Sequence, residues 1–200
     1  MKYNIIGIVG FIGSGKGTVG EYLVSHHGFK SESFAKNLKD SVSAIFGWPR
    51  ALLEGDTEES RIWRERPDAY WSTKLNKPVT PRWVLQYMGT EVMRNNFIDD
   101  IWILSLEKRI ADATQPIVIT DVRFPNEVAM IKRLGGTLLW VRRSLEPSWL
   151  ELALTDKPKL RSLDIVHPSE YEWVGVDNYI EVQNIASLNE LHSIIDNIVK

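Results

Sequence analysis

Phosphate-binding chemistry is indicated by residues 10–18, which read Gly-Phe-Ile-Gly-Ser-Gly-Lys-Gly-Thr. Glycines allow successive backbone N–H groups to point at one centre, and Lys16 adds a mobile positive charge. The run follows the apolar segment 5–9, as expected of a strand that leads through a glycine-rich loop into a helix. The pattern Gly-x4-Gly-Lys therefore predicts a P-loop for nucleotide phosphates. We assign the donor-phosphate site to six residues of this run: Gly13, Ser14, Gly15, Lys16, Gly17 and Thr18.

One position departs from the general pattern, which places Ser or Thr directly after the lysine to bind magnesium. Here that position is Gly17, and the hydroxyl comes one residue later, at Thr18. Gly-Lys-Gly-Thr resembles the loop of the adenylate-kinase group of nucleoside monophosphate kinases. That resemblance implies a metal held mostly by phosphates, water and more distant carboxylates.

Composition excludes several classes of protein. The 200 residues suit one domain with an inserted subdomain, and the absence of cysteine excludes disulfides and thiolate metal sites. A formal charge of −2 argues against a general nucleic-acid surface. No apolar run approaches the roughly 20 residues of a membrane span. We therefore expect a cytoplasmic protein with neither nucleic acid nor membrane as a partner.

Strand and helix patterns alternate along the chain, which predicts an α/β protein with a five-stranded parallel sheet and helices on both faces. The expected strands are 4–9, 30–34, 117–121, 137–141 and 179–183. The expected helices are 16–26, 35–46, 81–95, 99–113, 125–134 and 187–199. Residues 47–80 and 144–176 lack a clean period, so we read 1–200 as one domain with an acceptor-side insertion and a lid-like insertion.

Ligands of such a sheet bind beyond the carboxyl ends of its strands. That rule places the loop 10–15, Asp121–Arg123, Arg142, Arg143 and Asn184 along one rim. Arg123 has the fork geometry that matches phosphate oxygens. Arg142 and Arg143 alternate sides if the strand persists, so only one of them is expected to face the site.

The motifs now reached resemble those of the bacteriophage deoxynucleoside monophosphate kinases, over most of the chain. The matching segments are Gly13–Thr18, Phe34–Asp40, Leu85–Glu91, Asn95–Phe97, Asp121–Glu127, the arginine after the fourth strand, His167–Glu170 and Asn184–Leu191. The middle motifs are less widespread than the P-loop and carry the more specific part of the resemblance.

The resemblance implies a three-layer P-loop kinase fold and transfer of the γ-phosphoryl group of ATP, with Mg²⁺, to a deoxynucleoside monophosphate. The product would supply deoxynucleotides for phage DNA synthesis in the host cytoplasm. Family members can be dimers, so a homodimer is the further partner that the resemblance allows. Which bases are accepted, and whether deoxyribose is preferred over ribose, depends on the shape of the pocket.

Site residues follow from the rim and the resemblance together. The expected catalytic residues are Lys16, Arg123 and Arg142, and Asn184 joins the loop in binding the cofactor. Asp121 is expected to hold magnesium through water. The expected acceptor-binding residues are Leu38, Lys39, Arg82, Gln86, Gly89, Trp102, Asp121, Arg123 and Glu127. Ordinary structural roles remain open for several of them: Trp102 and Leu38 as core residues, Arg82 as a solvated residue and Asp121 as a helix cap.

Two other functions remain open from sequence. A kinase of another small molecule, such as dephospho-coenzyme A or phosphomevalonate, would share the loop and the layout. A nucleotide-dependent switch protein would share the loop and a carboxylate like Asp121. Against a switch, the chain has no Asn-Lys-x-Asp motif and no second carboxylate after Asp121. Sequence does not choose among Arg61, Arg64 and Arg66 as an acceptor contact, and it assigns no role to His167 and Glu170.

Overall fold

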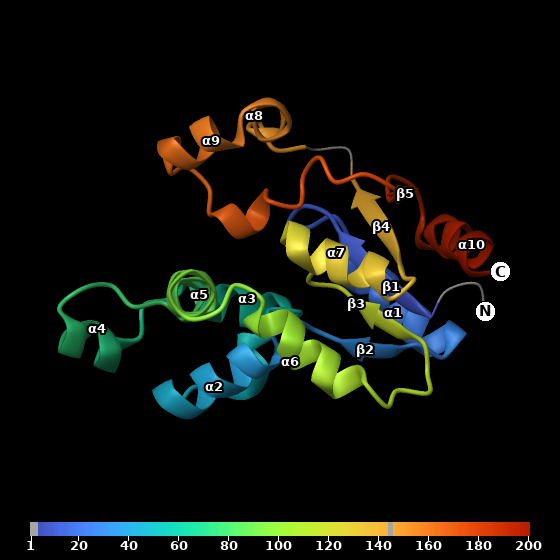
Figure 1. Ribbon diagram of the computed structural model, residues 1–200. Helices are drawn as coiled ribbons and strands as arrows, with labels where there is room; N and C mark the ends of the chain where they lie inside the picture. The colour runs from blue at the N-terminus through green and yellow to red at the C-terminus, as the bar shows by residue number, and fades with distance from the viewer. Residues whose placement is uncertain (1–3, 144–145) are drawn as a thin grey trace. The chain divides into compact units, whose positions relative to one another are not determined.

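The computed structural model describes residues 4–143 and 146–200 of the chain (Figure 1). The chain divides into two compact units, Met1–Ser33 with Leu106–Lys200, and Phe34–Ser105. The expected lid-like insertion falls in the first unit and the acceptor-side insertion in the second.

The first unit is built on a five-stranded parallel sheet with the order β2-β3-β1-β4-β5, which confirms the expected α/β architecture. Its strands are β1 (Ile5–Val9), β2 (Lys30–Glu32), β3 (Ile117–Ile119), β4 (Thr137–Arg142) and β5 (Tyr179–Gln183). β1 and β3 are buried along their whole length, as their uninterrupted apolar sequences predict. β2 and β3 end two residues earlier than expected, and the Ser33 hydroxyl donates to Asp121 Oδ2 at 2.7 Å just beyond their ends.

Helices cover both faces of this sheet (Figure 1). Ile6 and Ile8 of β1 form one core with side chains of α1 (Lys16–His27) and α10 (Leu188–Val199). Gly7, which points the other way, lies against Ile131 of α7 (Pro125–Arg133), so closely that a Cβ on Gly7 would be 2.4 Å from Ile131 Cδ1. The alternation of β1 therefore separates two helical layers, as expected.

The segment 146–176 of the first unit is more regular than its sequence indicated. It contains α8 (Leu150–Thr155), α9 (Lys157–Leu163) and a 3₁₀ turn, η3 (Pro168–Glu170). Leu160 and Trp173 are buried in it. The ring of Phe11, in the glycine-rich loop, lies 5.1 Å from the ring of Trp173 and 5.4 Å from that of Trp149. Aromatic packing thus joins this segment to the loop.

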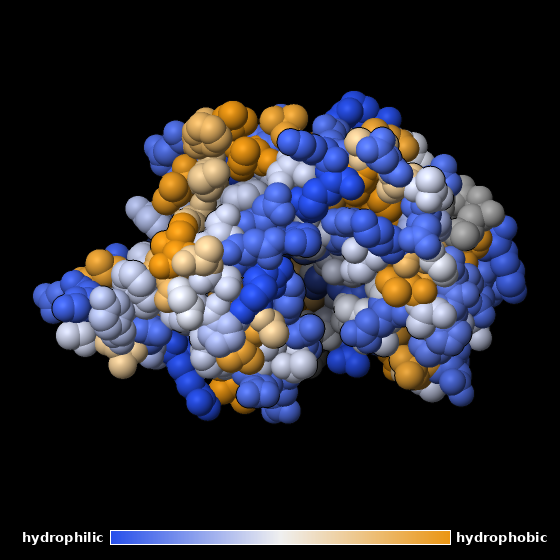
Figure 2. Space-filling model, turned by 90° about the horizontal axis from the view of Figure 1, so that it is seen from below, coloured by the Kyte–Doolittle hydropathy of each residue, from blue (hydrophilic) through white to orange (hydrophobic). Residues whose placement is uncertain are grey.

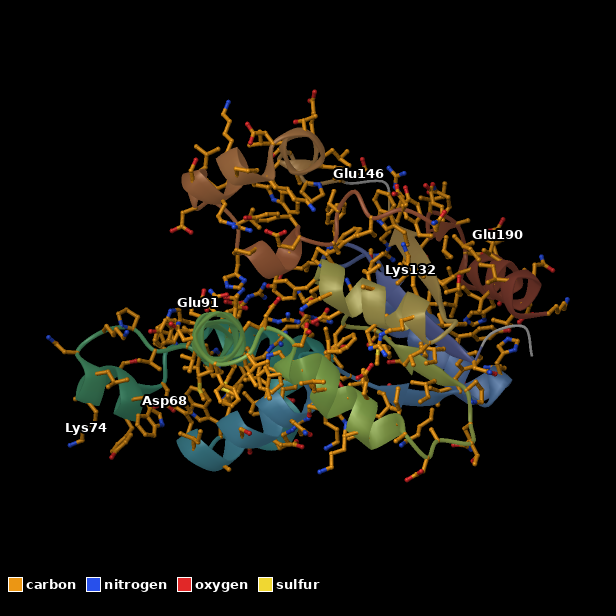
Figure 3. All side chains as sticks on the ribbon, in the orientation of Figure 1. Asp68, Lys74, Glu91, Lys132, Glu146 and Glu190 are labelled. Atoms are coloured by element: carbon orange, nitrogen blue, oxygen red, sulfur yellow. The ribbon has the colours of Figure 1, made fainter. Side chains whose placement is uncertain are left out.

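The second unit is helical. Its elements are α2 (Lys36–Phe46), η1 (Arg50–Leu53), α3 (Glu58–Glu65), α4 (Ala69–Leu75), α5 (Pro81–Gln86), a π-helix η2 (Tyr87–Arg94) and the start of α6 (Ile101–Ile110). Side-chain caps explain where three of these helices begin: Thr57 caps α3, Asp68 caps α4 (Figure 3) and Thr80 caps α5. The single helix expected over 81–95 is therefore α-helical for its first six residues and a π-helix beyond them.

The surface seen in Figure 2 is largely polar, with apolar residues in separate patches among polar ones. Such scattered exposure is ordinary for folded proteins. Among the helices that the structure describes, none is both long and apolar enough to cross a lipid bilayer.

Candidate phosphate-transfer site

The loop between β1 and α1 needs glycine at two positions for reasons of space. A Cβ on Gly10 would lie 2.5 Å from the carbonyl oxygen of Val141, and one on Gly15 would lie 2.2 Å from Asn184 Nδ2. Gly15 also has a φ of 101°, in the left-handed region that side chains other than glycine rarely adopt. These glycines let the loop close tightly against β4 and against the residue that follows β5.

Asn184 holds the loop from the side of β5. Its Nδ2 donates to the carbonyl of Ser14 at 2.8 Å, and its own backbone N–H donates to the carbonyl of Arg142 at 2.8 Å. Ser14 is buried, and its Oγ has no hydrogen-bond partner among the described residues. A buried hydroxyl of this kind fits a phosphate oxygen as its partner. The loop therefore suits the phosphates of a nucleotide, as its sequence predicts.

Lys16 lies at the first position of α1 and folds back over the loop. Its ammonium donates to the carbonyls of Gly10 at 2.7 Å and Phe11 at 2.8 Å. Burial lowers the pKa of Lys16 to about 8; the Arg123 guanidinium adds to this lowering, and the Glu170 carboxylate opposes it. The cationic form of Lys16 is thus retained at neutral pH but is lost at a lower pH than for an ordinary lysine.

Arg123 is fixed by the start of α7. The carboxylate of Glu127 accepts hydrogen bonds from the backbone N–H groups of Arg123 at 2.6 Å and Phe124 at 3.1 Å, in the manner of a capping box. Glu127 is buried, and its contact with Arg123 is to the backbone N–H at the start of α7. Glu127, expected from the sequence to bind the acceptor, is thus seen to position the backbone of Arg123.

The guanidinium of Arg123 is held by the η3 turn. Its Nη1 donates to the carboxylate of Glu170 at 2.8 Å and to the carbonyl of Ser169 at 3.2 Å. His167 precedes this turn, and its Nδ1 accepts from the backbone N–H of Ser169 at 3.3 Å. Sequence assigned no role to His167 and Glu170; the structure places His167 as the cap of the turn and Glu170 as the ion-pair partner of Arg123.

The structure separates the two arginines that follow β4. Arg142 pairs with Glu181 at 3.0 Å and with Glu146 (Figure 3), and its guanidinium lies over the ring of Trp140. Arg143 instead donates from Nη1 to the carbonyl of Gly13 at 3.2 Å. The geometry therefore brings Arg143 to the phosphate loop in the place expected for Arg142, because a strand that ends at Arg142 turns the next residue toward the loop.

Asp121 follows β3 and accepts from the Ser33 hydroxyl at 2.7 Å. Its carboxylate chemistry suits magnesium, an oxygen-seeking cation that keeps several waters. Across the described parts of the chain, His, Cys, Asp and Glu side chains nowhere gather in a group of three or more that could hold a metal ion. Asp121 stays the residue that we expect to contact magnesium, indirectly and through water.

In the second unit, two of the expected acceptor residues are paired with carboxylates. Lys39 donates to Glu54 Oε2 at 2.5 Å, and Arg82 Nη1 donates to Glu65 Oε1 at 3.0 Å. Burial acts to raise the pKa of Glu54, but hydrogen bonds from Lys39 and Arg50 outweigh it and lower that pKa. Gln86 is half-buried at the last position of α5, one turn after Arg82.

Leu38, Gly89 and Trp102 lie close together in the core of the second unit. A Cβ on Gly89 would lie 2.8 Å from Leu38 Cδ2, and the Trp102 indole N–H donates to the carbonyl of Gly89 at 2.9 Å. Trp102 is 9% exposed. The residue that approaches Gly89 closely is thus Leu38. Trp102 is buried and its indole N–H donates to the π-helix, which is the core role that the sequence left open for it.

The three arginines between residues 61 and 66, in the expected acceptor-side insertion, differ in their surroundings. Arg61 and Arg66 are exposed, whereas Arg64 is half-buried. A Cβ on Gly55 would lie 1.9 Å from Arg64 Nη2, so the guanidinium of Arg64 lies directly on the Gly55 backbone. Gly55 follows Glu54, the partner of Lys39. Lys39 and Arg64 thus contact neighbouring residues of the turn 54–55, a relationship without a local sequence signal.

Comparison with known proteins identifies the family. The model of the deoxynucleotide monophosphate kinase family matches residues 56–156, about half of the chain. A protein of Acanthamoeba polyphaga mimivirus with the provisional name deoxynucleotide monophosphate kinase is 32% identical over 205 residues, covering 94% of this chain and 92% of that protein. The chain belongs to the deoxynucleotide monophosphate kinase family. The kinase is therefore a phosphotransferase, and the expected family, fold class and reaction class are confirmed.

Further similarities of the kinase are more limited. The deoxynucleoside-5'-monophosphate kinase of Escherichia phage T5 is 37% identical over 93 residues, covering 46% of this chain and 34% of that protein. Among solved structures, the dephospho-CoA kinase of Campylobacter jejuni has a TM-score of 0.46 at 17% identity, covering 98% of this chain and 95% of that chain. The shikimate kinase of Aquifex aeolicus has a TM-score of 0.42 at 16% identity, covering 98% of this chain and 95% of that chain.

Proposed function

We propose that this protein transfers the γ-phosphoryl group of ATP to the phosphate of a deoxynucleoside monophosphate, giving ADP and a deoxynucleoside diphosphate. The observation that carries the proposal is the phosphate loop itself. Its glycines are required by space, its buried Ser14 hydroxyl suits a phosphate oxygen, and Lys16 and Arg143 bring positive charge to it. Family membership supplies the class of acceptor.

On the donor side, loop amides of residues 13–17 and the Thr18 hydroxyl would hold the β- and γ-phosphates. Lys16 would leave the carbonyls of Gly10 and Phe11 for the phosphate oxygens, which are stronger acceptors because they carry charge. Arg123 would stabilise the charge that spreads over the transferring group. Mg²⁺, when bound with ATP, would neutralise phosphate charge, and Asp121 would orient its water shell.

On the acceptor side, the monophosphate would be held by the second unit. Lys39, which pairs with Glu54, and Arg64, whose guanidinium lies on the next residue Gly55, would bind its phosphate. Arg82 and Gln86, one helical turn apart on α5, would contact the nucleotide, with the Gln86 amide able to donate to and accept from a base edge. These roles are supported by residue type and placement.

The experiment that tests the proposal measures ADP formation from ATP and Mg²⁺ with dAMP, dGMP, dCMP, dTMP and the matching ribonucleotides. Stimulation by one or more deoxynucleotides is expected, and the panel also reports base and sugar preference. Stimulation only by a non-nucleotide acceptor such as dephospho-coenzyme A would overturn the proposed acceptor class. ATP binding without stimulation by any acceptor would favour a switch protein.

Two further parts of the proposal concern the setting of the enzyme. The two relatives named above are viral, so we propose that the reaction supplies deoxynucleotides in the cytoplasm of an infected cell. A homodimer stays a prediction, and sedimentation equilibrium of the purified chain would test it.

A further inference from the structure

We infer that Glu170 is a positioning residue of the phosphoryl-transfer site, which presents Arg123 to the transferring phosphate. This inference rests on the proposed function. It starts from the ion pair between Arg123 Nη1 and Glu170 Oε1 at 2.8 Å, to which the Ser169 carbonyl adds a second acceptor at 3.2 Å. Both acceptors belong to the same short turn, η3.

The contact uses one edge of the guanidinium. Arg123 Nη1 makes both contacts, and within residues 4–143 and 146–200 no other group accepts a hydrogen bond from this side chain. The Arg123 side chain is 38% exposed, whereas that of Glu170 is 12% exposed. A guanidinium has five N–H donors in a fixed planar fork, so fixing Nη1 orients the remaining donors as a unit. The exposed edge can then meet phosphate oxygens in a fixed direction.

Glu170 is itself held firmly, which a positioning group requires. Its backbone carbonyl accepts from the Trp173 indole N–H at 3.1 Å, and Trp173 packs against Phe11 of the phosphate loop with ring centroids 5.1 Å apart. His167 caps the turn on the other side. A single short segment therefore ties Arg123 and the phosphate loop to one support.

Charge gives Glu170 a second effect in the same place. Lys16 and Arg123 are near enough for the guanidinium to lower the pKa of Lys16, after burial has lowered it most. The Glu170 carboxylate raises that pKa and so helps to keep Lys16 cationic. Among residues 4–143 and 146–200, Arg123 and Glu170 are the charged groups that shift the pKa of Lys16, and Arg143 is a further cation on the loop, at the Gly13 carbonyl. Removal of the Glu170 charge should thus lower the pKa of Lys16 further, so that a smaller fraction of Lys16 is cationic at alkaline pH.

The test compares Glu170→Gln with Glu172→Gln, a matched control. Glu172 lies two residues away and pairs with Arg161 on α9, away from the phosphate loop contacts described above. We expect Glu170→Gln to lower kcat roughly 10-fold with a KM for ATP changed less than about 3-fold, as for loss of an interaction made in the transition state. Glu172→Gln should retain kcat. Unchanged kcat in Glu170→Gln would overturn the inference.

Two further readouts separate positioning from simple destabilisation. In an Arg123→Ala background, Glu170→Gln should lower kcat little further, because the two side chains act as one unit. An equal loss in both backgrounds would contradict the inference. The dissociation constant of ADP is measured by calorimetry from about pH 6 to about pH 9. It should increase as the pH is raised, and in Glu170→Gln this increase should begin at a lower pH than in the wild type or in Glu172→Gln.

These measurements also distinguish the two proposals. Absence of deoxynucleotide-stimulated ADP formation by the wild type would count against the proposed function. The pH dependence of ADP binding does not need an acceptor, so it would still decide whether Glu170 supports the charge of Lys16. An active wild type with a pH profile that Glu170→Gln leaves in place would count against Glu170 alone.

Discussion

The ammonium of Lys16 donates to the carbonyl of Gly10 at 2.7 Å, which places the positive charge of the first helical residue back inside the loop that precedes it. The same burial that makes this contact possible lowers the pKa of Lys16 to about 8, with a further lowering by Arg123 and an opposing effect of Glu170. The lysine that we propose to bind phosphate therefore has a pKa near physiological pH.

The first prediction is a pH dependence of kcat/KM for ATP. Phosphate binding needs cationic Lys16, and the lowered pKa means that this cation is present below about pH 8 and lost above it. We expect kcat/KM for ATP to fall above about pH 8, tenfold per pH unit, instead of near the ordinary lysine pKa of about 10.4. Circular dichroism over the same range controls for unfolding. A profile that stays flat to about pH 10 would contradict the assignment.

The second prediction compares the two arginines after β4. Arg143 contacts the Gly13 carbonyl, whereas Arg142 is engaged by Glu146 and Glu181. Arg143→Ala should therefore lower kcat/KM for ATP by about tenfold, the usual effect of losing one charge-assisted contact. Arg142→Ala should retain activity and cost about 0–1 kcal/mol of stability, as for partly exposed ion pairs. Steady-state kinetics and thermal melts of both variants test this, and the reverse order of effects would restore Arg142 as the catalytic residue.

The third prediction concerns the contact between the Arg64 guanidinium and the backbone of Gly55. Gly55 has a φ of 71°, and its added Cβ would displace the Arg64 guanidinium. Gly47 has a φ of 70°, and a Cβ there would meet nothing within 4 Å. Both Gly→Ala variants should lose about 1–2 kcal/mol through backbone strain. Only Gly55→Ala should also raise the KM for the deoxynucleotide, by roughly tenfold, through the loss of one phosphate contact.

Equal KM values for the Gly55→Ala and Gly47→Ala variants would show that Arg64 does not bind the acceptor. Chemical denaturation of the two variants checks that their losses of stability are comparable. The KM for ATP should stay near the wild-type value in both, because the phosphate loop belongs to the other unit.

The fourth prediction tests the core role of Trp102. Trp102→Phe keeps an aromatic ring but removes the indole N–H that donates to the Gly89 carbonyl at 2.9 Å. A buried carbonyl left without its donor costs about 1–3 kcal/mol, so the midpoint of urea denaturation should fall. Kinetic constants should change little. A large increase in the KM for the deoxynucleotide without loss of stability would instead indicate that Trp102 contacts the base.

Local patterns in the sequence determined the phosphate loop, the five strands and the class of fold. The loop 10–18 is a contiguous run whose function depends on backbone N–H groups of neighbouring residues, so its chemistry is readable without any distant contact. The strands are short apolar runs with clear ends, and their alternation with helices leaves few possible topologies. For the same reason α1 and α10 begin within one residue of the expected positions.

Tertiary structure decided the partners of the charged side chains. Arg123 and Glu170 are 47 positions apart in the chain, Lys39 and its partner Glu54 are 15 apart, and the guanidinium of Arg64 lies on the backbone of Gly55. Alternation along the chain predicts that only one of Arg142 and Arg143 faces the loop, and only the contacts of the folded chain show that it is Arg143. The sequence predicts one ordinary helix over 81–95, whereas residues 87–94 form a π-helix whose Gly89 carbonyl accepts a hydrogen bond from Trp102. Such contacts join distant residues, so they exist only once the chain has folded.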